Sequence, residues 1–279
     1  VTGRLVRAEW FDPDQDTEAL ARFDAVVAGE VPKRSARRVR PNAATRNAGR
    51  MWTAVEQADE AALIAAHATS TEVIHHPTGA TYGMAGVLAQ FRGFWRGRNR
   101  RHVFDALATL GDSLVLWRHS YAHDGVDAKF GSVGPVEGDY FVVSEVDDRE
   151  QRKHTEVFAD DRLGEAVIRL YERQAELLPD GPARVCAAAT ARVMAAFHRH
   201  GSDPDGFDAA FAPGVVAIDH RTVGFGELRG RDAVLNAVRT FRDLSDDIGM
   251  RFDDILALSD HAILLRATQR GRARASGGA

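Results

Sequence analysis

Two histidines and two arginines stand at matching places along the chain and could support acid–base or anion-binding chemistry. His76 and His220 are 144 residues apart (220 − 76), and each follows a short apolar run. Arg118 and Arg266 are 148 residues apart (266 − 118). An imidazole with a pKa near ~6.5 can transfer a proton at neutral pH. A guanidinium can bind a carboxylate or a phosphate. These four residues are therefore the first candidates for a functional site.

The segments that carry these histidines are similar to each other. Val73-Ile74-His75-His76-Pro77 corresponds to Val216-Ala217-Ile218-Asp219-His220, and a glycine follows each segment at the same spacing. A second similarity relates Leu5 to Val27 with Lys153 to Leu178, at a shift of about 147 residues (156 − 9). Self-similarity at a fixed spacing indicates a repeated architecture, and this spacing suits a duplicated domain.

The repeats predict an α+β protein made of tandem domains. The order of the elements resembles a cone-shaped fold, so each domain is expected to be a curved antiparallel sheet wrapped around helices. One complete copy is expected at residues 42–178, where helical patterns precede a series of strands. The other expected parts are a terminal strand and helix of a preceding copy (1–30), a basic linker (31–41), a second domain that lacks its last strands and helix (182–268), and a disordered tail (269–279).

The incomplete second domain would leave an unpaired sheet edge. One explanation is that the chain is a fragment of a longer repeat array. The other is that Leu5 to Val27 dock onto the second domain and supply the missing part, within one molecule or between neighbours. We expect this leading segment to occupy the open edge.

Composition limits the function classes. The 279 residues carry a formal net charge of −4, and 44% of them are hydrophobic, which is typical of globular domains. No excess of positive charge predicts nucleic-acid binding. No apolar run approaches the ~20 residues of a membrane span, and the first residues have no signal-peptide pattern, so a cytoplasmic location is expected. The single Cys186 cannot form an internal disulfide.

The order of helices and strands resembles the nuclear transport factor 2-like superfamily, and within it the SnoaL-like group. The phrases that carry this resemblance are Ala8-Glu9-Trp10-Phe11-Asp12, Ile218-Asp219-His220-Arg221 and Gly224 to Asp232. They are similar to SnoaL-like repeats found in tandem near the ends of large actinobacterial signalling proteins. The fold hosts isomerases, cyclases, hydrolases and plain binding modules, so it does not fix an activity.

The resemblance implies a role for His76. Ketosteroid-isomerase-like members carry a general-base Asp before Pro at the end of the first strand, and His76 takes that place here. The oxyanion donors of those enzymes are not matched, because Met51, Val193 and Phe141 occupy the corresponding positions. Without such donors an enolate is not stabilised, which counts against isomerase chemistry.

A ligand pocket is the other expectation. Its predicted lining consists of aromatic residues, the arginines and the second histidine, namely Trp52, Phe94, Trp117, Arg118, Tyr140, His220 and Arg266. Each has a structural alternative: aromatics at such spacing also form plain core, and arginines form ion pairs. No His pair has a third ligand at suitable spacing, so neither a metal site nor a cofactor is predicted.

Two functions from different classes follow. The favoured one is a non-catalytic tandem module that binds a small apolar or weakly anionic molecule, or packs against a protein partner, within a larger regulatory protein. The alternative is a small isomerase, cyclase or hydrolase with His76 as base and Arg118 as anion holder. A dimer through the open sheet face is expected in either case.

Overall fold

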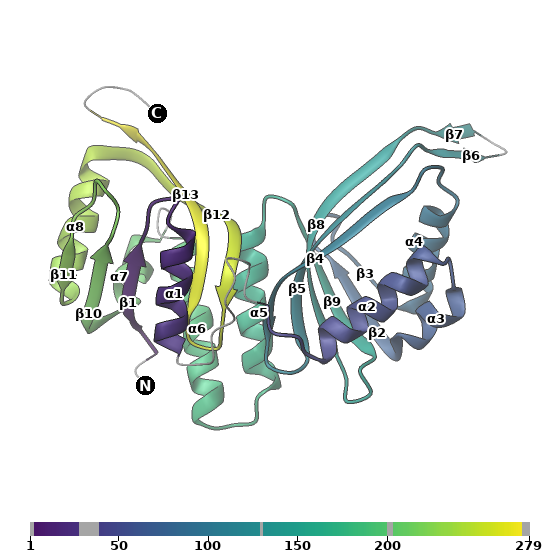
Figure 1. The fold of residues 1–279 in the computed structure, drawn as a ribbon, viewed down its shortest axis with the longest axis horizontal. Coiled ribbons are helices and arrows are strands. Elements are labelled where there is room, and N and C mark those ends of the chain that lie inside the picture. Colours follow the sequence, from purple (N-terminus) through teal and green to yellow (C-terminus); the bar gives the residue numbers. More distant parts are fainter. Residues whose placement is uncertain (1–2, 28–38, 129–130, 200–202, 275–279) are drawn as a thin grey trace. The chain divides into compact units, whose positions relative to one another are not determined.

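A computed structural model describes residues 3–27, 39–128, 131–199 and 203–274 of the chain (Figure 1). The chain forms a mixed α+β structure with curved sheets, and it divides into two compact units. Unit 1 combines Val1–Arg38 with Val167–Ala279, and unit 2 is Val39–Ala166. Most of the expected basic linker (31–41) lies outside the described residues.

Unit 2 is built on a six-stranded sheet in the order β3-β2-β9-β8-β5-β4. All neighbouring strands are antiparallel except β2 and β9, which are parallel. A separate two-stranded hairpin, β6–β7, extends the chain between β5 and β8. The strands are β2 (His67–His75), β3 (Ala80–Tyr82), β4 (Arg101–Leu110), β5 (Leu114–His123), β6 (Val126–Ala128), β7 (Gly131–Val133), β8 (Val136–Val146) and β9 (Arg152–Ala159).

Helices α2 (Ala43–Glu56), α3 (Glu60–Ala65) and α4 (Met84–Trp95) cover one face of this sheet (Figure 1). Asn42 begins α2 with a capping box, in which its side chain accepts from the Thr45 amide and Thr45 reciprocates. The side-chain amide of Asn42 also donates to the carbonyls of Gly111 and Leu114, which fixes α2 on the β4–β5 turn.

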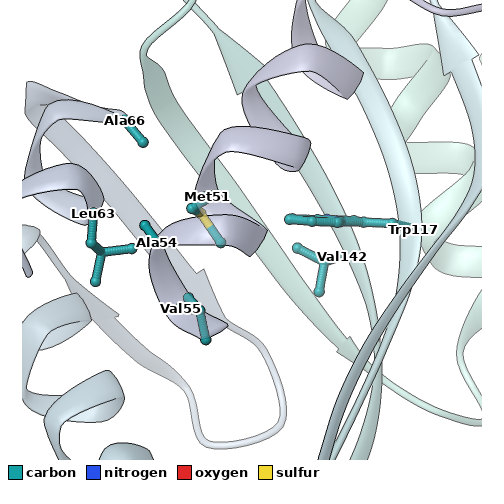
Figure 2. Close-up of a cluster of buried hydrophobic side chains, with 7 residues drawn as sticks. All are labelled: Met51, Ala54, Val55, Leu63, Ala66, Trp117 and Val142. Carbon is teal, nitrogen blue, oxygen red and sulfur yellow. The ribbon is translucent and has the colours of Figure 1, made fainter. Parts of the chain in front are cut away.

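The core of unit 2 forms where α2 and α3 face the sheet. Figure 2 shows Met51 of α2 beside Trp117 and Val142 of the sheet. Trp117 is only 2% exposed and is among the largest fully buried side chains. The complete cluster is Met51, Ala54, Val55, Leu63, Ala66, Trp117 and Val142.

Unit 1 contains a three-stranded sheet in the order β1-β10-β11 and a two-stranded sheet, β12–β13. Its core gathers Phe207, Phe211 and Val215 against Val234 and Leu235 of α8. The strands are β1 (Leu5–Trp10), β10 (Phe211–Asp219), β11 (Glu227–Arg229), β12 (Ser245–Leu258) and β13 (Ile263–Ala273). The helices are α1 (Asp16–Val27), α5 (Leu163–Leu177, which begins in unit 2), α6 (Pro182–His198), α7 (Pro204–Ala209) and α8 (Arg231–Leu244).

The leading strand β1 pairs in parallel with β10, and this pairing has the register found in unit 2. Glu9 of β1 lies opposite Ile218, just as Glu156 of β9 lies opposite Ile74. Both pairs agree with the sequence shifts of 147 and 144 residues. The described residues of unit 1 contain no counterpart of β8, and its two sheets are accordingly separate.

The structure differs from the expected tail (269–279) in its first residues, which belong to a strand. Strand β13 continues to Ala273, so residues 269–273 pair with the first part of β12 rather than forming a tail. Opposite charges favour this pairing, because Arg272 lies opposite Asp246 and the Nε atom of Arg274 is 2.7 Å from the Asp246 carboxylate. Residues 275–279 lie outside the described residues.

Candidate functional site

A cavity of about 60 Å³ lies in unit 2 between the helices and the sheet. Its lining includes exposed Gln90 on α4 and also Arg152 on β9, which is only 4% exposed. Its lining is mostly apolar and aromatic, with histidines and one arginine among it. The lining residues are Met51, His67, Val73, His75, Tyr82, Val87, Gln90, Phe91, Phe104, Trp117, His119, Tyr140, Val142, Arg152, Thr155 and Val157.

Arg152 is the charged group at the buried end of this cavity. Its guanidinium carbon lies 4.3 Å from the centroid of the Trp117 ring, a cation–π arrangement. Its Nε and Nη2 atoms are buried and have no hydrogen-bond partner among the described residues. Burial lowers the pKa of Arg152 to about 9, so the guanidinium still carries its charge at neutral pH. A buried cation without a carboxylate partner is unfavourable unless something else compensates it.

His119 lines the cavity, and it contacts His102, which does not line it. The Nε2 atoms of His119 and His102 are 2.6 Å apart, so one ring must donate to the other. Trp52 stacks on His102 with ring centroids 4.4 Å apart, and Phe104 stacks on His119 at 4.5 Å. Burial and the neighbouring imidazole lower the pKa of His102 to about 3.

His119 and His67 are also held neutral. Burial, together with the positive charge of Arg152, lowers the pKa of each to about 4. His67 is anchored by a 2.8 Å contact between its Nδ1 atom and the Leu63 carbonyl. Burial likewise lowers the pKa of His75, at the other end of β2. Imidazoles with such low pKa values are weak bases, because proton transfer is most effective when the pKa is near the working pH.

The aromatic residues predicted for the pocket surround this site. Trp117 and Tyr140 line the cavity. Trp52 and Phe94 lie one layer away and contact His102, with Phe94 and His102 ring centroids 5.2 Å apart. All four residues also contact the core cluster or the aromatic network around it. This agrees with the alternative that these aromatic residues are part of the core.

His76 and Arg118 do not line this cavity, contrary to the expectation that an enzyme would hold both inside it. The alternation of side chains along strands explains this placement. Trp117 and His119 face the cavity, so Arg118 between them faces away, with its guanidinium carbon 5.3 Å from the Phe141 ring centroid. The ring of His76 packs on Phe158, 4.5 Å between centroids.

His76 instead belongs to an arrangement that occurs in both units. Its Nε2 atom lies 3.0 Å from Glu156. In unit 1, the Nε2 atom of His220 lies 2.9 Å from Glu9, and the His220 ring stacks on Phe11 at 4.5 Å. The same three residue types thus meet in the same way at matching positions.

Glu9 is the centre of the unit 1 arrangement. Burial acts to raise the pKa of Glu9, but hydrogen bonds from Arg7, His220 and Arg22 outweigh it and bring the pKa below its usual value. The Nε atom of Arg22 on α1 is 2.9 Å from the carboxylate. These contacts tie β1, α1 and the end of β10 together, which is a structural role. Arg266 also forms an ion pair, with Asp16 of α1.

Arg152, His102 and His67 were not predicted as site residues. His119 could have been found, because it is two residues from Trp117 on the same strand and therefore on the same face.

Arg152 could not have been found from alternation, since a bulge shifts its register. Glu145 pairs with His154 and Val146 with Arg152, which leaves Lys153 as the extra residue. Simple alternation from Thr155 would have turned Arg152 away from the cavity.

Within the described residues, no cluster of three or more His, Cys, Asp or Glu side chains is arranged to hold a metal ion. None of the helices in the same part of the chain is long and apolar enough to cross a bilayer.

Replacing Arg152 with Met should raise the free energy of unfolding of the ligand-free protein by about 2 kcal/mol, since an uncompensated buried charge is removed while most of the side-chain volume is kept. The measurement is urea denaturation followed by tryptophan fluorescence. Arg101→Met, at an exposed position on β4, is the matched control and should change stability by less than about 0.5 kcal/mol. A loss of stability in Arg152→Met would mean that the guanidinium has a stabilising partner.

In a comparison with known protein families, residues 190–279, which lie within unit 1, match the family described as SnoaL-like domain. None of the curated proteins matches the chain.

Among solved structures, the chain is similar to IdmH from Streptomyces antibioticus, a candidate polyketide cyclase (15% identity, 42% of this chain and 91% of that one, TM-score 0.35). It is also similar to RV0760c from Mycobacterium tuberculosis in complex with estradiol-17β-hemisuccinate (12% identity, 43% and 95%, TM-score 0.36). A nuclear transport factor 2-like protein from Burkholderia thailandensis has 19% identity over 43% of this chain and 92% of its own, with a TM-score of 0.32.

Proposed function

We propose that this chain is a non-catalytic binding protein and that the cavity of unit 2 holds a small molecule. The observation that carries the proposal is the cavity itself, because it has an exposed entrance, an aromatic wall and a buried polar end. Cavities of this composition are the usual sites of small ligands.

The polar groups around the cavity support binding more than catalysis. No Asp or Glu is among the described residues that line it. His119 is engaged with His102, and both rings have pKa values far below neutrality. The enzymatic alternative with His76 as base has less support, because this ring contacts Glu156 and Phe158 and does not line the cavity.

The two units are further proposed to be copies of one ancestral domain. The shared register of β1–β10 and β9–β2 supports this, as does the matching His–Glu–Phe arrangement. The domain limits, the dimer, the cytoplasmic location and a role within a larger regulatory protein stay predictions of the sequence.

The proposal predicts that small neutral molecules enter the cavity of the full chain. Acetamide and propionamide should shift the methyl NMR signals of Val73, Val87 and Val142, which line it. Val157→Phe places a ring into the lining and should reduce these shifts at least tenfold at a fixed ligand concentration. Val103→Phe adds the same ring at an exposed position of β4 and should leave them unchanged.

Circular dichroism of both variants checks that they fold, because overpacking costs about 1–3 kcal/mol. Absence of methyl shifts in the wild-type protein with either compound would contradict the proposal. So would shifts that persist undiminished in a folded Val157→Phe variant.

A further inference from the structure

The cavity of unit 2 is rich in hydrogen-bond donors that have no partner. Four buried atoms of its lining residues lack one among the described residues: Nε and Nη2 of Arg152, Nε1 of Trp117 and Oγ1 of Thr155. Guanidinium and indole nitrogens can only donate, and a hydroxyl can do so as well. Buried polar groups are normally satisfied, so this set requires an acceptor.

The charge at this end of the cavity is also uncompensated. Arg152 keeps its positive charge at neutral pH, while His67 and His119, with pKa values of about 4, are neutral there. The described lining contains no carboxylate. Water could accept the hydrogen bonds but would bring no countercharge, whereas an anion supplies both.

The dimensions limit what this anion can be. A volume of about 60 Å³ is well below the ~150 Å³ of well-studied apolar cavities that take up benzene. A carboxylate with a short chain therefore fits as the cavity stands. Gln90 is exposed, and its side-chain oxygen accepts from the Tyr82 hydroxyl at 3.2 Å, so a longer body would leave the cavity past these two residues.

We propose that the ligand of unit 2 is a small monocarboxylate, with its carboxylate on the guanidinium of Arg152 and its apolar body directed along the aromatic wall towards Tyr82 and Gln90. This inference rests on the proposed function, since it specifies the class of molecule that the same cavity binds. Guanidinium is the group best suited to a carboxylate, because its planar donors match the two oxygens. The Trp117 indole, which packs on the guanidinium, is the adjacent donor.

The test compares propionate with propionamide, which has nearly the same shape but no charge. Both are titrated into the full chain in a buffer of low chloride concentration, and binding is followed by NMR at the Trp117 indole N–H and the cavity methyl groups. We expect propionate to bind about 10- to 100-fold more tightly, the range given by charge-assisted hydrogen bonds. Equal or weaker binding of propionate would overturn the inference.

Three variants assign the effect to Arg152. Arg152→Met should abolish the preference for propionate while propionamide still binds. Arg152→Lys, which keeps a point charge without the planar donors, should retain part of the preference. Arg101→Met removes an exposed positive charge from β4 and should behave as the wild type. If Arg152→Met binds propionate as tightly as the wild-type protein, the inference is wrong.

The possible failures are distinguishable. If neither compound reaches the cavity of the wild-type protein, the proposed function and this inference fail together. If propionamide binds and propionate has no advantage, only the inference fails. Should Arg152→Met not fold, the wild-type preference and its partial retention in Arg152→Lys still decide the question.

Discussion

Removal of residues 1–27 is expected to unfold unit 1 and to leave unit 2 folded. The deletion takes away β1, the parallel partner of β10, and α1, which packs against β12 and β13. Leu20 of α1 is 4% exposed, and Leu5 and Trp10 pack against the core of unit 1. Burial of each large apolar side chain contributes about 1.5–3 kcal/mol, so the total loss is on the order of 5 kcal/mol or more.

Polar contacts add to this loss. Glu9 accepts from Arg22 and His220, and the Asp12 carboxylate accepts from the backbone amide of Thr222 at 2.8 Å. In the deletion variant His220 loses its partner at the end of β10. Stabilities of folded domains are typically about 5–15 kcal/mol, so unit 1 should not remain cooperatively folded.

Hydrogen exchange measured by mass spectrometry or NMR checks this prediction. Amides of β10 and β12 should lose protection in the deletion variant, whereas those of β2, β5 and β8 should keep it. A synthetic peptide of residues 1–27, added in excess, should restore part of the protection of β10. Undiminished protection of β10 in the deletion variant would show that the leading segment is dispensable.

Acidification from pH 6.5 to 4 should destabilise unit 2 strongly. His67 and His119 have pKa values of about 4 in the folded protein and ~6.5 when unfolded. Between these pKa values the unfolded state binds more protons than the folded state, so the free energy of unfolding falls as the pH falls from about 6.5 to 4. The full contribution of the neutral histidines to stability is present above this window. At pH 5 each histidine should contribute a loss of about 2 kcal/mol, approaching about 3 kcal/mol at pH 4.

The histidine pair gives a variant that isolates this effect. In His102→Phe/His119→Phe both partners of the buried contact become apolar, which leaves neither nitrogen unsatisfied. Its stability, from urea denaturation at several pH values, should fall less steeply than that of the wild type between pH 6.5 and 4. His261→Gln, at an exposed turn, is the control and should not change the slope. Parallel slopes for all three proteins would mean that these rings titrate normally in the folded state.

The fold was predictable where patterns are local. The helical pattern expected from residue 42 corresponds to α2, and Asn42 begins this helix with a capping box. Trp117 of β5 lies in the core, which was the structural alternative given for the aromatic residues. The end of β13 was not predictable, since Gly271 and a run of arginines suggest disorder. The pairing with residues 245–250 of β12 makes residues 269–273 a strand, and this pairing is not visible in the local sequence.

The candidate site was harder to predict, because it depends on register. Trp117 and Tyr140, two of the residues predicted for the pocket, line the cavity. Arg118, predicted beside Trp117, faces away because side chains alternate along β5. The face of Arg152 depends on the bulge at Lys153, which no local pattern reveals. The low pKa of His119 depends on burial and on that same arginine, so it follows only from the assembled sheet.

The pairing of β1 with β10 has a consequence during synthesis on the ribosome. Glu9 and its partner Ile218 are 209 residues apart (218 − 9), and at about 5–20 residues per second β1 emerges roughly 10–40 s before β10. Unit 2 lies wholly within that interval and can fold during it. Until translation reaches β10, β1 of the nascent chain is an unpaired strand. Chaperones could bind it, or it could pair with β10 of another chain made on the same polysome.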